Sequence, residues 1–143
     1  MAKSKLFILF VVILCAVCLP LEIWAKRTAP DPVKPVFQGS CKIQATGTGS
    51  SGKVVVSKRC KCFYKPKIFT IYEINYLKSL ENDVQDLHIT KLEIDKDLLI
   101  VKTEKGGIFS CNIPTGKVKL IKLPQGYELI PTTASVIKLK VKR

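Results

Sequence analysis

The sequence contains a single histidine, His88, and it lacks the motifs by which common enzyme classes are identified. His88 lies in an alternating apolar pattern typical of a strand, where a lone histidine is more often structural than a general base. No serine or cysteine motif accompanies it. The glycine-rich stretch 45–52 lacks the Lys-Ser/Thr ending of a phosphate-binding P-loop. The sequence therefore predicts a protein that is not an enzyme and uses no cofactor.

Recognised metal-binding spacings are also missing. Glu93, Asp95 and Asp97 cluster beside a predicted turn, but they lack the ligand spacing and the glycine of an EF-hand loop. Cys60 and Cys62 are separated by one residue, whereas zinc sites typically use two to four. We expect a polar turn and no metal site.

No apolar run is long enough for an ordinary membrane helix. The longest, Leu6–Leu19, has 14 residues, whereas a span needs roughly 20. Lys3 and Lys5 precede it, Pro20 ends it, and Ala25 offers a small residue for cleavage. This order is typical of a signal peptide, so residues 1–25 are predicted to direct secretion to the extracellular space. An uncleaved anchor is the alternative, because two basic residues follow Ala25.

Acidic residues are scarce at both ends of the chain after this segment. Residues 26–67 hold 10 basic and 1 acidic side chain, residues 68–116 hold 5 and 8, and residues 117–143 hold 7 and 1. Such ends can simply be solvated, or they can bind a polyanion. Because the protein is predicted to be secreted, sulfated glycosaminoglycan or an anionic membrane surface is favoured over nucleic acid. The candidate contacts are Lys58, Arg59, Lys61, Lys65, Lys67, Lys117, Lys119, Lys122, Lys138, Lys140, Lys142 and Arg143.

Four cysteines follow the signal segment: Cys41, Cys60, Cys62 and Cys111. An even number in a small secreted chain predicts two disulfides. Cys60 and Cys62 are too close in sequence to pair comfortably. Cys60 therefore pairs with Cys41 while Cys62 pairs with Cys111, or the two exchange partners.

The region 98–123 predicts a β-meander. Its β-rich runs 98–104, 108–113 and 117–123 are separated by Lys-Gly-Gly and Pro-Thr-Gly turns. Residues 86–94 alternate as a further strand with one irregularity. We expect a small α+β or mostly β fold, an antiparallel three- to four-stranded meander stabilised by disulfides, with flexible basic N- and C-terminal arms.

Two segments permit more than one interpretation. Ile71–Leu80 has apolar residues three apart, as in a helix, although isoleucine and tyrosine also suit strands. Val136–Arg143 alternates apolar residues with lysine and is either a basic edge strand or a disordered tail.

The sequence as a whole is predicted to divide into a signal peptide at 1–25, a flexible arm at 26–56, a β-rich domain at 57–123 and a basic tail at 124–143.

Part of the chain resembles the CXC chemokines. The motif Ser-Lys-Arg-Cys-Lys-Cys at 57–62 is similar to the family's C-x-C opening. The stretch 100–114 resembles its second and third strands, with matches at Thr103, Lys105, Gly107, Cys111 and Pro114. The family's third cysteine and C-terminal helix pattern are missing. The resemblance implies a secreted cytokine-like ligand that binds heparan sulfate and docks on a cell-surface G-protein-coupled receptor through the region after Cys62.

Two other functions fit the composition. A cationic secreted protein can act in host defence on anionic bacterial membranes, with Val136–Arg143 as the membrane-active part. It can also be a component of an extracellular matrix, a venom or the reproductive tract that adheres to polyanions. Leakage of anionic vesicles caused by the isolated tail would favour the first of these.

Overall fold

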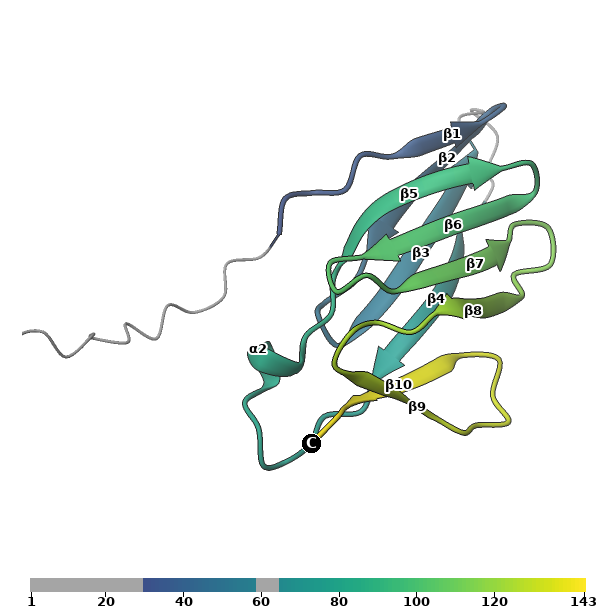
Figure 1. Ribbon diagram of the computed structural model, residues 1–143. Helices are drawn as coiled ribbons and strands as arrows, with labels where there is room; N and C mark the ends of the chain where they lie inside the picture. The colour runs from purple at the N-terminus through teal and green to yellow at the C-terminus, as the bar shows by residue number, and fades with distance from the viewer. Residues whose placement is uncertain (1–29, 59–64) are drawn as a thin grey trace, which may run out of the picture.

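The computed structural model describes residues 30–58 and 65–143, which form two facing β-sheets (Figure 1). Strands β1 to β4 and the short helix α2 come first, at Val36–Gln38, Cys41–Thr46, Ser51–Lys58, Lys67–Ile74 and Asn82–Gln85. Strands β5 to β10 follow at Ile89–Asp95, Leu98–Thr103, Ile108–Asn112, Val118–Lys122, Tyr127–Ile130 and Ile137–Val141.

The two sheets have different sizes and connections. The larger has six strands in the order β1-β2-β3-β4-β10-β9, and the smaller has four in the order β5-β6-β7-β8. Neighbouring strands run antiparallel except β4 and β10, which are parallel, with Ile137 opposite Tyr72. The last strand thus returns to the larger sheet between β4 and the edge strand β9, more than 60 residues after β4.

The core lies between the two sheets because each strand in contact with it turns one apolar face inward. Ile43 and Tyr72 of the larger sheet and Leu99 and Phe109 of the smaller one are fully buried. The rings of Tyr72 and Phe109 stack across the core with centroids 5.2 Å apart. Both sheets therefore contribute to one hydrophobic core.

The predicted meander is confirmed. Strands β6, β7 and β8 match the three predicted runs to within one or two residues at each end, and β5 pairs antiparallel with β6. The expected irregularity is a bulge at Ile89/Lys91. Gly106 and Gly116 adopt a positive φ in the two turns that separate these strands. The fold is mostly β, one of the two predicted alternatives, but the described residues hold ten strands in two sheets instead of the three to four strands expected, because the segments on both sides of the meander also form strands.

The prediction of flexible basic arms is wrong for the described residues. The stretch 36–58 forms β1, β2 and β3, and its Val54 is fully buried. At the other end, β10 is neither a disordered tail nor an edge strand, because it pairs with both β4 and β9. Its Leu139 is fully buried. The meander needs these strands because a single sheet leaves one apolar face uncovered.

The segment 71–80 is not a helix. Strand β4 extends to Ile74, because its β-branched and aromatic residues pack well on a pleated sheet. A loop then follows, and the fully buried Gln85 fixes it. The Gln85 side-chain amide donates to the carbonyls of Leu77, Leu80 and Glu81 and accepts from the Leu77 N–H.

No helix among the described residues is both long and apolar enough to cross a membrane.

Candidate functional site

A depression of about 350 Å³ lies on the outer face of the four-stranded sheet, and we call it the β8 depression. It is lined by Leu98, Ser110, Asn112, Thr115, Lys117 and Lys119. The strand register explains why these residues meet. Leu98 pairs with Asn112, and Ser110 pairs with Lys119, so their side chains project from the same face. Two of the predicted polyanion contacts thus border a polar hollow.

The turn between β7 and β8 holds one wall of the depression in place. The Asn112 side-chain oxygen accepts hydrogen bonds from the N–H of Thr115, at 3.0 Å, and from its hydroxyl, at 2.7 Å. The Lys117 carbonyl accepts from the Asn112 N–H at 2.9 Å. Gly116 completes the turn with a φ of +72°. The polar wall is therefore pre-organised.

The charges on this sheet are distributed unevenly. On β5 and β6, Glu93 contacts Lys91 and Lys102, each at 2.7 Å. Hydrogen bonds, first from Lys102 and then from Lys91, lower the pKa of Glu93 to about 2. Lys117, which directly precedes β8, and Lys119 of β8 are exposed, and neither has an acidic partner within the described residues. The positive charge of this sheet is therefore uncompensated at the β8 edge.

The other predicted polyanion contacts do not gather at one place. Lys138 and Lys140 project from β10 in the larger sheet, where Lys140 pairs with Glu128 at 2.9 Å. Lys67 lines a separate hollow of about 250 Å³. Lys122 is exposed further along β8, and Lys65, Lys142 and Arg143 are exposed elsewhere. The backbone of Lys58 ends β3, and Arg59 and Lys61 lie outside the described residues.

The predicted cysteine pairing remains a prediction. Cys60 and Cys62 lie outside the described residues, and Cys41 and Cys111 have free thiols in the structure. Burial raises the pKa of the Cys111 thiol, which favours the protonated and unreactive form. Cys41 pairs with Lys58 across β2 and β3, so the chain that leads to Cys60 starts beside it.

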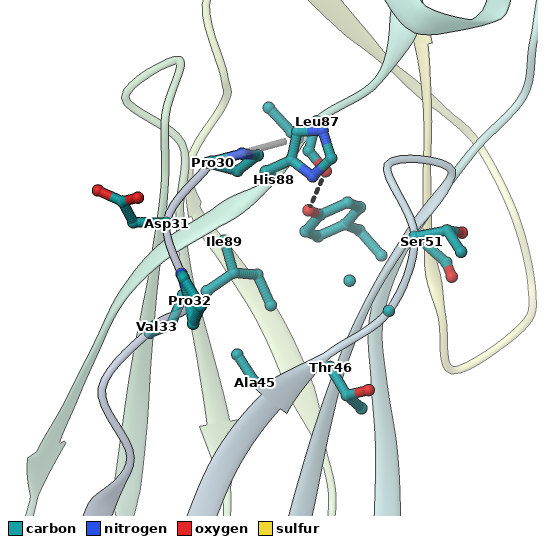
Figure 2. Close-up of a pocket in the computed structure, with 14 residues that line it drawn as sticks. Pro30, Asp31, Pro32, Val33, Ala45, Thr46, Ser51, Leu87, His88 and Ile89 are labelled. Atoms are coloured by element: carbon teal, nitrogen blue, oxygen red, sulfur yellow. Dashed lines mark hydrogen bonds between the residues drawn. The ribbon is translucent and has the colours of Figure 1, made fainter. Parts of the chain in front are cut away.

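His88 lines a second cleft, of about 300 Å³, between residues 30–33 and the β2–β3 turn (Figure 2). Its polar residues are Asp31, Thr46, Thr48, Ser51 and His88. The backbone of His88 exchanges hydrogen bonds with Glu104, which joins this segment to the end of β6. These bonds involve only the backbone of His88, so the structural role predicted for its side chain remains a prediction.

Tyr72 also lines this cleft and is fully buried, and its hydroxyl donates a hydrogen bond of 2.6 Å to the Leu87 carbonyl. Desolvation raises the pKa of this tyrosine, so its hydroxyl remains a donor at neutral pH.

We predict that Tyr72→Phe lowers the free energy of unfolding by about 1–3 kcal/mol, because the buried Leu87 carbonyl loses its partner. Urea denaturation followed by circular dichroism measures this loss. A stability equal to that of the wild type would show that water replaces the hydroxyl.

Comparisons add no relatives to this description. No protein-family model, curated protein or solved structure matches the chain. In the part of the chain that the structure describes, no three histidine, cysteine or acidic side chains are grouped so that they could hold a metal ion.

Sequence reasoning identified Lys117 and Lys119 but missed Leu98, Ser110 and Thr115, since only the strand register brings these residues beside the lysines.

Proposed function

We propose that this protein is a secreted, non-enzymatic binding protein whose β8 depression binds sulfated glycosaminoglycan. The observation that supports this most is the pairing of two exposed lysines without acidic partners, Lys117 and Lys119, with a pre-organised polar hollow. Lys117 directly precedes β8, and the hydrogen bond from the Asn112 N–H to its carbonyl continues the β7–β8 pairing. Two residues apart in extended chain, Lys117 and Lys119 project on the same side about 7 Å from each other. They can therefore contact successive anionic groups along one polymer.

The lining of the depression suits a sulfated sugar better than a bare anion. The Ser110 and Thr115 hydroxyls and the Asn112 amide can exchange hydrogen bonds with sugar hydroxyls. Leu98, 39% exposed, offers an apolar patch for a sugar ring. The lysines supply the long-range attraction, and the overall formal charge of +13 adds to it.

We predict that Lys117→Ala combined with Lys119→Ala weakens heparin binding by about tenfold at 0.15 M salt. The slope of log Kd against log salt falls by about two, because each lost lysine contact releases roughly one fewer counterion, by analogy with phosphate polyanions. Isothermal titration of the full-length secreted protein at four salt concentrations measures both quantities.

A matched control separates the site from total charge. Lys34 and Lys78 are exposed lysines away from the depression, so replacing both with alanine removes the same charge. This control should keep most of the affinity. If both double variants lose affinity equally, binding depends on diffuse charge and the proposed site is wrong.

The other functions have less structural support. Residues 118–141 form β8, β9 and β10, where the chemokine family has its helix, so a chemokine-like ligand that docks on a receptor remains a proposal based on residues 57–114. For host defence, Leu139 of the proposed membrane-active segment is fully buried in the sandwich. A membrane role through this segment would require β10 to leave the sheet. Glycan binding requires no such rearrangement.

A further inference from the structure

Strand β9 forms one edge of the larger sheet, and the side of β9 that faces the smaller sheet is not covered by it. A groove lies beside this uncovered side. The groove has a volume of about 490 Å³, and we call it the β9 groove. Its apolar lining comes from Val118 of β8, Leu129 and Ile130 of β9, Ile137 of β10 and Val136 before it, and the rest comes from Lys117 and the loop after β9. The smaller sheet ends at β8, so it does not cover β9. As a result Leu129 is 50% exposed, while its partner Leu139 is fully buried.

The backbone of Leu129 points out of the sheet at this edge. The Lys142 N–H donates to the Gly126 carbonyl at 2.9 Å. Hydrogen-bonded pairs alternate along an antiparallel ladder, so Glu128/Lys140 is bonded and Leu129/Leu139 is not. The same assignment follows from the other side of β10. The Leu139 carbonyl accepts a hydrogen bond from the Asn75 N–H, at 2.8 Å, so it faces β4 and not β9. The N–H and C=O of Leu129 therefore face the free edge.

We propose that the β9 edge and the β9 groove bind an extended peptide of another protein, which adds a strand to the larger sheet and alternates apolar with acidic residues. Strand addition satisfies the outward N–H and C=O of Leu129, and alternate apolar side chains fill the groove. The peptide is expected to be acidic because this region of the protein is basic. Residues 117–143 hold seven basic side chains and one acidic side chain, Glu128, which is paired with Lys140.

A second copy of the chain is a poorer occupant. Two copies each carry a formal charge of +13, and pairing β9 with β9 would bring two basic regions of residues 117–143 together. An acidic peptide instead gains from these charges. The proposal does not depend on glycan binding, since the β9 groove and the β8 depression share only Lys117 among their lining residues.

The test uses a fluorescein-labelled nonapeptide of alternating valine and glutamate, and the same peptide with lysine in place of glutamate. Fluorescence anisotropy with the full-length secreted protein should show binding of the glutamate peptide and at least tenfold weaker binding of the lysine peptide. On binding, amide hydrogen exchange at Leu129 should slow by at least about tenfold, because its N–H becomes hydrogen-bonded.

Two variants locate the contact. Leu129→Pro removes an N–H that makes no bond to β10, and proline is tolerated at such edge positions. It should weaken peptide binding by about tenfold, with an unchanged thermal midpoint and unchanged heparin affinity. Should this variant fail to fold, Leu129→Asp places a like charge in the groove and should weaken binding similarly, while the control Ile68→Asp, at a residue 61% exposed, should not.

Several results would overturn the proposal. These are equal binding of the two peptides, no binding of either, or full binding by the folded Leu129 variants. A concentration-dependent dimer in sedimentation that Leu129→Pro abolishes would identify a second copy as the occupant instead.

Discussion

Deletion of residues 136–143 is expected to abolish cooperative folding of the protein. Strand β10 lies between β4 and β9, so its loss breaks the larger sheet at two interfaces. It also removes the fully buried Leu139 and the partly buried Ile137 and Val141, which pack against the core. Unpaired buried backbone groups on β4 would add to the cost. Urea denaturation followed by circular dichroism should show no sigmoidal transition.

A charge-only control distinguishes this structural role from a basic tail. Lys138, Lys140 and Lys142 can be replaced together with glutamine, which removes three charges but keeps the apolar residues of the strand. We expect a cooperative transition within about 1 kcal/mol of the wild type, because exposed ion pairs such as Lys140–Glu128 contribute little. Full folding of the deletion variant would contradict the position of β10 between β4 and β9.

The meander was predictable because its signals are local. Alternating residues set the faces of β6, β7 and β8, and glycines with positive φ mark the turns. The partner of β10 was not predictable in this way. Alternation in residues 136–143 indicates a strand, but nothing local specifies a parallel pairing with Tyr72 and Glu73, which are separated from it by more than 60 residues.

Strands β2 and β3 were missed because residues 26–56, which are rich in proline, glycine and serine, were predicted to form a flexible arm. Here two of the glycines permit close packing instead. A Cβ atom on Gly52 would lie 2.3 Å from Cε1 of Tyr72, and one on Gly49 would lie 2.1 Å from Cγ of Asp86. Composition alone cannot separate these two uses of glycine, because both require only the absence of a side chain.

The candidate site was predictable in its charge but not in its shape. The basic end of the chain drew attention to Lys117 and Lys119, since charge is visible in the sequence. The rest of the lining depends on Ser110 and Leu98, which are ordinary strand residues until the register places them beside the lysines. A sequence with the same charges and another register would have no depression there.

Phe109→Ala is the point substitution from which we expect the largest loss of stability. Phe109 is fully buried in β7, and its ring stacks on Tyr72 of the opposite sheet at 5.2 Å. Truncating such a residue leaves a cavity between the sheets, with an expected cost of about 3–5 kcal/mol. Because small domains are stable by about 5–15 kcal/mol, the variant should be close to unfolding at 25 °C. Guanidinium denaturation measures the shift in midpoint.

The same substitution at Phe37 shows whether the cost comes from the core. Phe37 is 49% exposed on the edge strand β1, so its truncation removes less buried surface and should cost less than half as much. A cavity at Phe109 also leaves the Tyr72 ring without its stacking partner, and the hydroxyl of the same ring donates to the Leu87 carbonyl. Phe109→Ala and Tyr72→Phe should therefore couple, and their double variant should lose less stability than the sum of the single losses. Strict additivity would mean that the hydrogen bond and the ring contact stabilise the sandwich independently.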